Sequence, residues 1–211
     1  CTPGGSYDTG LELCQKVYGY QGPEKVAYEW LRLGDRDMKT SKGIVFTPKR
    51  FLEIAEPEIL RMLILQNNPN KHISIRVEEM ENYYNEFQSL EQKYYGLEEP
   101  ESESEKNEIE FIYPLICTGE VPKNWPGRLP FKLKLVLVQL TPLLGKDKVY
   151  EKAKDYMTRE NFENHIPKDV LFERLEKVEN WLEEIKNMLE TEKDPKLIKT
   201  IKYKVPMFSF I

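Results

Sequence analysis

The chain has 211 residues, of which 40% are hydrophobic and 32% are charged, and its formal net charge at pH 7 is −5. A chain of this length can bury one good core or two small ones. Its apolar runs are far shorter than the roughly 20 residues of a membrane span, so no membrane partner is expected. The 3 cysteines include no CxxC pair, which argues against a zinc site and favours reduced thiols in the cytoplasm.

The charge is unevenly divided. Residues 1–122 hold 13 Lys and Arg against 22 Asp and Glu, whereas residues 123–211 hold 18 against 14. A basic C-terminal part can meet an acidic partner such as nucleic acid, although charged helical surfaces often reach a value of this size.

The N-terminal third alternates between turns and regular elements. Residues 1–10 are rich in Pro and Gly and read as a turn, and the apolar spacing over 11–18 predicts a helix. After Gly22-Pro23, the stretch EKVAYEWLRL (24–33) predicts a mostly buried strand. Helix, turn and strand in this order resemble the closing unit of an α/β nucleotide-binding domain.

A basic loop separates this unit from the next helix. The stretch DRDMKTSKGIVFTPKRF (35–51) carries Arg36, Lys39 and Lys42 just before a marked helix start, where Thr47 offers an N-cap hydroxyl and Pro48 fills the first helical position. Surface loops rich in Lys, Ser and Gly commonly have no chemical role. The alternative interpretation is a mobile phosphate-binding loop.

The middle of the chain is expected to be helical on both sides of a turn. Pro57 predicts the start of a second helix, and NNPNKHISI (67–75) predicts a turn followed by a short extended piece. The aromatic stripe of the helix expected over 77–96 suits core packing better than stacking on bases. The acidic segment 98–108 predicts a disordered or loop-like insertion, and 109–122 predicts a short extended apolar element.

Three helical patterns follow, over 131–144, 146–157 and 167–190, and the last has apolar residues at steps of three and four. The chain begins with Cys1 inside turn material and ends on the apolar run MFSFI. A partial chain is therefore expected.

Five blocks occur in a characteristic order: GGSYDTG, YGY, YEWLRL, DMKTSKG and EPEILRMLI. In this order and spacing the chain resembles the class I lysyl-tRNA synthetases of the archaeal type. MKTSKG (38–43) is similar to the signature loop of that family, commonly M-S-S-S-K-G. Lys39 and Thr40 stand where the family usually has serines, and Asp37 where it often has lysine.

The resemblance implies an α/β fold, namely the C-terminal part of a class I nucleotide-binding Rossmann-like domain, followed by a mostly α-helical domain. Residues 1–46 would end the catalytic domain and 47–122 would form a connecting, stem-contact-like helical domain with the acidic insertion. Residues 123–211 would form a helical tRNA- or anticodon-binding region, truncated at its end. The family's H-I-G-H-like and G-K-D-H stretches are absent, so the chain alone is expected to be inactive.

The resemblance also implies a reaction. ATP, with Mg²⁺, activates L-lysine to lysyl-adenylate, and the lysyl group then passes to tRNA(Lys). The implied catalytic residues are Lys42 and Lys39, whose cations would stabilise the charge on the departing pyrophosphate. The implied ATP-binding residues are those of the loop: Met38, Lys39, Thr40, Ser41, Lys42 and Gly43. No metal-ligating residues are predicted.

Tyr28, Gly5 and Ser6 are the implied lysine-binding residues. The alternatives are a Tyr28 packed beneath the sheet and a plain tight turn at the glycines. Two other functions stay open at this stage: a non-catalytic helical module that binds RNA or protein, and a glutamyl- or glutaminyl-type class I relative.

Overall fold

The computed structural model describes residues 4–29, 31–34, 36–37, 46–191 and 195–204. The helices are α1 (Ser6–Lys16), α2 (Pro48–Ile54), α3 (Pro57–Leu65), the 3-10 helix η2 (Val77–Glu79), α4 (Met80–Tyr94), α5 (Glu103–Ile116), α6 (Phe131–Arg159), α7 (Lys168–Thr191) and α8 (Pro195–Lys204). The strands are β1 (Leu31–Leu33), β2 (Arg36–Asp37) and β3 (Ile73–Ile75). Within these ranges, no helix combines the length and apolar character needed to cross a membrane.

The sheet is small and mixed. Central β1 pairs antiparallel with β2 and parallel with β3, and α2 and α3 lie in the connection between the two parallel strands. Gly34, at φ 57°, turns the chain after β1, and its N–H donates to Ile75 O at 2.7 Å. The hydroxyl of Ser74 donates to Gly34 O, so β3 fixes this turn through both backbone groups.

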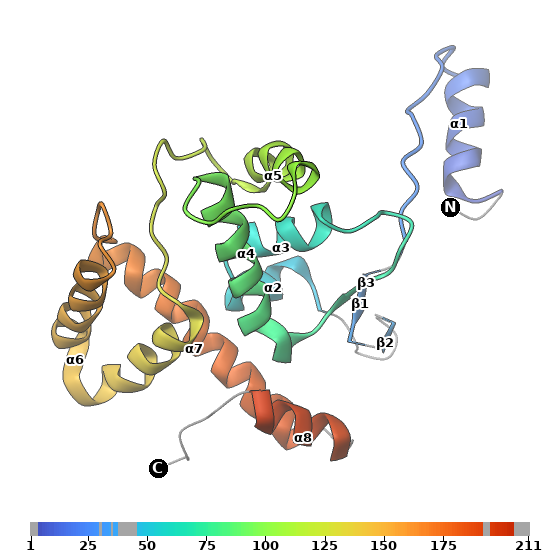
Figure 1. The fold of residues 1–211 in the computed structure, drawn as a ribbon. Coiled ribbons are helices and arrows are strands. Elements are labelled where there is room, and N and C mark those ends of the chain that lie inside the picture. The colour runs from blue at the N-terminus through green and yellow to red at the C-terminus, as the bar shows by residue number, and fades with distance from the viewer. Residues whose placement is uncertain (1–3, 30, 35, 38–45, 192–194, 205–211) are drawn as a thin grey trace.

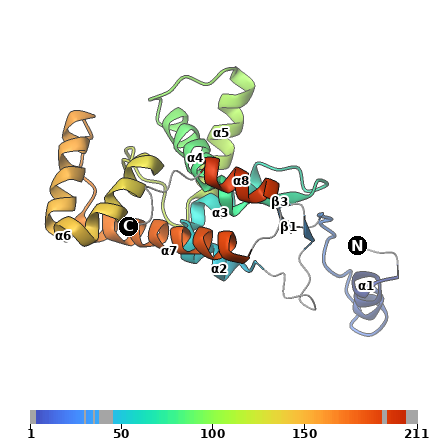
Figure 2. The same cartoon turned by 90° about the horizontal axis from the view of Figure 1, so that it is seen from below.

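Helix α1 and the extended segment 17–29 lie apart from the other helices in both views (Figures 1 and 2). The predicted helix over 11–18 is confirmed and begins earlier, at Ser6, within residues predicted to be a turn. The strand predicted over 24–33 is wrong except for β1. Val26 and Tyr28 are 76% and 79% exposed, and in the part of 24–29 that the structure describes only Glu29 N reaches another segment's backbone, at Pro69 O. A strand needs a partner along its length, and 24–28 has none in the described structure.

The core lies between the helices α2 to α7. Its fully buried side chains come from segments that are far apart in sequence; they include Phe51, Ile59, Met62, Phe87, Tyr113 and Trp181. The predicted core role of the aromatic stripe on α4 is confirmed, since Tyr83, Tyr84 and Phe87 are all buried. Trp181 of α7 donates its indole N–H to Val77 O at 2.7 Å, which ties α7 to η2.

Helix α5 corrects two predictions, because it occupies most of the acidic segment 98–108 and the start of 109–122, where an extended element was expected. The Ser102 hydroxyl caps it by accepting from Glu105 N at 3.1 Å. Acidic residues in its first turn are favoured by the helix dipole. Further along, apolar residues at helical spacing face the core: Ile109, Ile112, Tyr113 and Ile116. The acidic composition therefore marks a helix start rather than a loop.

The three helical patterns in the C-terminal part are confirmed. The first two, 131–144 and 146–157, are the two halves of α6, which meet in a V at Gly145 (Figure 1). Gly145 has φ 77° and ψ 158°, a conformation that other residues resist. The third pattern, 167–190, is α7. Ile201 of α8 is fully buried, so α8 also contributes to the core.

Candidate functional site

The predicted ATP-binding residues Met38 to Gly43 lie outside the described residues, but both ends of their segment are fixed. On the N-terminal side, Asp37 of β2 pairs with Arg32 of β1. On the C-terminal side, Phe46 is 4% exposed, and its ring meets that of Phe51 edge to face at a centroid distance of 6.1 Å. The described residues on either side of the segment thus belong to the sheet (Asp37) and to the helical core (Phe46).

Helix α2 starts at Pro48, two residues after Phe46, as the sequence predicts. Thr47 accepts a hydrogen bond from Arg50 N at 3.2 Å, and Pro48 occupies the first turn. Pro57 begins α3 as predicted, so α2 ends at Ile54.

Helix α7 lies along α2 in both views (Figures 1 and 2) and contacts it through polar side chains. Lys177 Nζ donates to Leu52 O at 2.7 Å, and Asn180 Nδ2 donates to Glu53 O at 3.0 Å. Arg50 Nη2 lies 2.7 Å from both carboxylate oxygens of Glu184. The helix that follows the basic segment is therefore held by residues more than 120 positions later in the chain.

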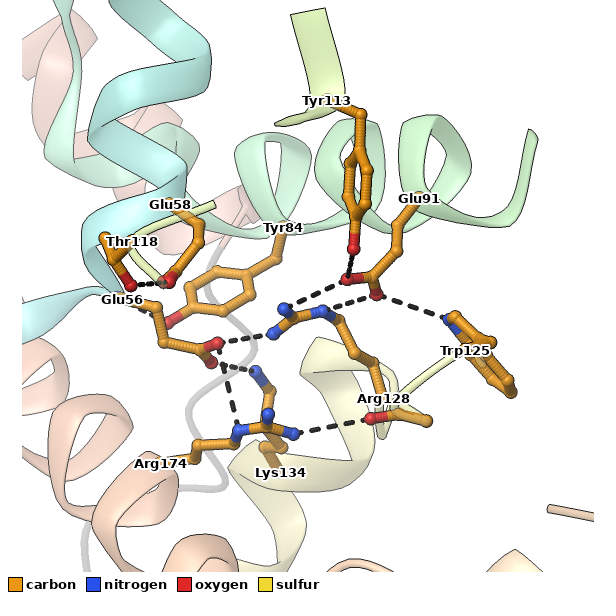
Figure 3. A network of polar contacts seen from close by, with 11 residues as sticks. Glu56, Glu58, Tyr84, Glu91, Tyr113, Thr118, Trp125, Arg128, Lys134 and Arg174 are labelled. Atoms are coloured by element: carbon orange, nitrogen blue, oxygen red, sulfur yellow. Dashed lines mark hydrogen bonds and ion pairs between the residues drawn. The ribbon is translucent and has the colours of Figure 1, made fainter. Parts of the chain in front are cut away.

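Glu56, between α2 and α3, enters a buried cluster of charges (Figure 3). Arg128 Nη1 donates to Glu56 Oε2, while Lys134 Nζ lies 3.7 Å from Oε1 and Arg174 Nε 3.8 Å from Oε2. The backbone N–H of Glu56 donates to Tyr84 OH at 3.4 Å. The junction of α2 and α3 is thereby tied to α4, α6 and α7.

Glu91 is the second carboxylate of the cluster, and its side chain is 1% exposed. Arg128 donates to it from Nε at 2.6 Å and from Nη2 at 3.2 Å. Tyr113 OH and the Trp125 indole N–H donate to the same carboxylate at 2.9 and 3.2 Å. Both oxygens of Glu91 are therefore satisfied without water (Figure 3).

The cluster holds three cations against two carboxylates, and burial acts together with these charges on its pKa values. Burial raises the pKa of Glu56, but attraction to Arg128, Lys134 and Arg174 outweighs burial and lowers the pKa to about 2. Burial is the largest cause that lowers the pKa of Lys134 to about 8; attraction to Glu56 opposes it, and repulsion from Arg128 and Arg174 adds to it. The fold therefore disfavours the charged form of Lys134, which we call the surplus cation of the cluster.

The residues predicted to bind lysine are described but are not brought together. Gly5 precedes α1 as its N-cap, Ser6 opens the helix, and Gly4, at φ 75°, makes the tight turn. Tyr28 is 79% exposed, so the alternative of a tyrosine buried beneath the sheet is wrong. Among the described ranges, no hydrogen bond, ion pair or ring contact joins Tyr28 to Gly5 or Ser6. Their role in a lysine pocket stays a prediction.

Sequence reasoning missed the contacts that fix α2. Glu56 and Glu184 look like ordinary surface carboxylates in the sequence. The one local signal is Pro57, which restricts the backbone of Glu56 to the extended region that it occupies.

Comparison with known proteins gives a family. Residues 1–115 match the model of the class I tRNA synthetases of the lysine type. A lysine–tRNA ligase from Methanococcus maripaludis is 37% identical over 145 residues, which cover 65% of this chain and 27% of that protein. One from Methanocaldococcus jannaschii is 32% identical over 187 residues, which cover 84% of this chain and 35% of that protein.

The chain spans about a third of the length of the curated relatives it matches. The family match takes in β1, β2, the basic segment with its MKTSKG motif, and helices α2 to α4, and it ends within α5. This match agrees with the order of blocks seen in the sequence and with the fixed residues on both sides of the basic segment. The chain belongs to the class I lysyl-tRNA synthetase family of the archaeal type.

Proposed function

We propose that the complete gene product carrying this chain is a lysine–tRNA ligase. It activates L-lysine with MgATP as co-substrate and transfers the lysyl group to tRNA(Lys). The observation that carries the proposal is the family match over residues 1–115, which includes the MKTSKG motif between two fixed anchors. A cytoplasmic location accords with this function.

The chemistry proposed for the segment is electrostatic. The lysine carboxylate attacks the α-phosphate of ATP, the bond to the β-phosphate bridging oxygen breaks, and pyrophosphate leaves with a growing negative charge. Lys42, with Lys39, supplies a cation where this charge develops, which accelerates the step more than it tightens ground-state binding. Thr40 and Ser41 offer hydroxyl donors, Met38 and Gly43 complete the ATP-binding segment, and a compact ammonium on a flexible stem suits such a role.

The fold supports a Rossmann-like origin for the catalytic part. Parallel strands need a crossover connection, and β1 reaches its parallel neighbour β3 through a stretch that contains α2 and α3. In this proposal, residues 1–46 end the nucleotide-binding domain. Residues 47–122 approach the acceptor part of the tRNA, and the net positive region 123–211 contacts tRNA further along. Tyr28, Gly5 and Ser6 contribute to the lysine pocket.

The proposal is tested by lysine-dependent ATP–pyrophosphate exchange in the complete gene product. Lys42→Ala should lower the exchange rate about a hundredfold, by analogy with the loss of one charge-stabilising contact, and leave the KM for lysine almost unchanged. Lys152→Ala, which removes an exposed lysine of α6, is the control and should leave the rate unaltered.

Three results would contradict it. Exchange by Lys42→Ala within threefold of wild type would remove the assigned role of Lys42. Exchange stimulated by glutamate or glutamine in place of lysine would assign the protein to another class I specificity. Binding of tRNA without any amino-acid-dependent exchange would favour a non-catalytic RNA-binding module.

A further inference from the structure

The C-terminal end of α2 lacks its own backbone donors, and α7 supplies replacements. In a continuing helix, Leu52 O and Glu53 O would accept from the N–H groups of residues 56 and 57. Here the N–H of Glu56 donates to Tyr84 OH at 3.4 Å, and Pro57 has no N–H. Lys177 Nζ and Asn180 Nδ2 donate to these two carbonyls instead, at 2.7 and 3.0 Å. A cation is also favoured at a helix C-terminus by the dipole.

The same face of α7 reaches the start of α2. Positions 177, 180 and 184 are spaced by three and four residues, which places them on one side of the helix. Glu184 binds Arg50 in the first turn of α2 through two 2.7 Å contacts. The contact therefore fixes both ends of α2 against a single helix.

Arg50 extends this contact to the residue where the basic segment re-enters the fold. Its guanidinium carbon lies 5.8 Å from the centre of the Phe46 ring, and Phe46 packs edge to face on Phe51. The Glu184 side chain is 16% exposed, whereas the Arg50 side chain is 48% exposed. Half-exposed ion pairs add little to folding stability, so the geometry that this one imposes matters more than its energy.

We propose that Arg50 and Glu184 are positioning residues for lysine activation. The pair sets the place of Phe46 and the first turn of α2 relative to α7, and thus the anchor from which Lys42 acts. This inference rests on the proposed function. Catalytic groups displaced by about 1 Å can lose a large part of their rate effect, so a small shift of this anchor suffices to slow the reaction.

The experiment uses the complete gene product and compares five proteins: wild type, Arg50→Met, Glu184→Gln, the charge swap Arg50→Glu with Glu184→Arg, and the control Lys186→Met. Lys186 Nζ lies 2.7 Å from Glu183 on the same helix, so the control removes an ion pair of equal length that does not touch α2. Each protein is assayed for the kcat of pyrophosphate exchange, the KM for lysine and the melting temperature.

Arg50→Met and Glu184→Gln should each lower the exchange kcat about tenfold, with the KM for lysine within threefold of wild type and the melting temperature within about 2 °C of the control. The charge swap should return to within about fivefold of wild type. A role in folding alone would not produce this split between kcat and KM, nor the recovery.

Several outcomes would overturn the proposal. Single variants within twofold of wild type would show that the pair does not set the anchor. A swap as slow as the singles would show that ion pairing between these two positions does not set the anchor. Loss of soluble protein in either single variant would show that the pair is needed for folding. A wild-type protein without lysine-dependent exchange would remove the proposed function itself, whereas an active wild type with unaffected variants would remove only this inference.

Discussion

Two substitutions in the buried charge cluster should change stability in opposite directions at pH 7. Arg128 neutralises both Glu56 and Glu91, and these side chains are 8% and 1% exposed. Arg128→Met leaves Glu91 with two neutral donors, Tyr113 and Trp125, and leaves Glu56 with cations no closer than 3.7 Å. Removing one partner of a buried ion pair typically costs about 3–5 kcal/mol. The free energy of unfolding of Arg128→Met should fall by that amount.

Lys134 is the opposite case. Its pKa falls from 10.5 to about 8, mainly through burial, and one pKa unit corresponds to about 1.36 kcal/mol. The charged form is therefore disfavoured in the folded chain by about 3 kcal/mol. Lys134→Met removes this penalty, keeps most of the side-chain volume and leaves Glu56 with Arg128 and Arg174. Unfolding free energy should stay unchanged or rise by about 1–3 kcal/mol.

Urea denaturation of the 211-residue chain, followed by far-UV circular dichroism, measures both changes. Lys132→Met is the matched control, because Lys132 pairs with Glu81 at 3.2 Å but its side chain is 73% exposed. That control should lie within about 0.5 kcal/mol of wild type. A loss above about 2 kcal/mol in Lys134→Met, or below about 1 kcal/mol in Arg128→Met, would refute the assignment of Lys134 as the surplus cation.

Three further predictions concern pH, a helix junction and a cap. The pKa of Glu56 is about 2 in the folded chain, against its usual value of 4.5. Its contribution of about 3 kcal/mol is therefore present above pH 4.5 and is lost as the pH falls towards 2. Acid titration of the unfolding free energy should show this decline, and Glu56→Gln should lack it. Gly145→Ala should lower the free energy of unfolding by about 1–3 kcal/mol through backbone strain alone, because an added Cβ meets no atom within 4 Å. Gly119 is equally open but has no positive φ, so Gly119→Ala should leave the free energy of unfolding unchanged. Equal urea midpoints of the two variants would contradict the strain at Gly145. Ser102→Ala should lower the free energy of unfolding by about 1 kcal/mol in the same assay, because α5 loses its N-cap. Ser104→Ala, inside the helix, should be near neutral. Equal free energies of unfolding for the two variants would argue against the cap.

Local chemistry predicted most of the helices. Thr47 and Pro48 mark the start of α2, and Pro57 marks the start of α3, because cap and proline preferences act within a few residues. The apolar spacing over 167–190 predicted α7 for a similar reason. These features depend on neighbours in sequence and hardly on tertiary context.

Two errors show where local signals mislead. The composition of 98–108 suggested disorder, but the Ser102 cap and the apolar spacing from Ile109 onward were present and were given too little weight. For 24–29 the apolar residues suggested a buried strand, whereas burial and pairing depend on what lies alongside, and Val26 and Tyr28 are exposed. A strand needs partners that its own residues do not specify.

The contacts around the candidate site were beyond prediction from a single sequence. Arg50 and Glu184 are 134 positions apart, and Arg128 lies 72 positions from Glu56. Nothing in the local pattern of a charged residue states which distant charge it meets. The motif MKTSKG could be recognised, but the helices that fix its C-terminal anchor had to be seen in three dimensions.

The distance along the chain between α2 and its partners has a consequence for synthesis on the ribosome. At about 5–20 residues per second, Glu184 is made roughly 7–27 s after Arg50. During this interval α7 is not yet made, so three carbonyl oxygens lack the donors that it later provides: Leu52 O, Glu53 O and Val77 O. The buried face of α2, which includes Phe51 and Ile54, also remains uncovered. A nascent chain arrested before residue 168 should therefore recruit chaperones through this face, and release once α7 has emerged should end that binding.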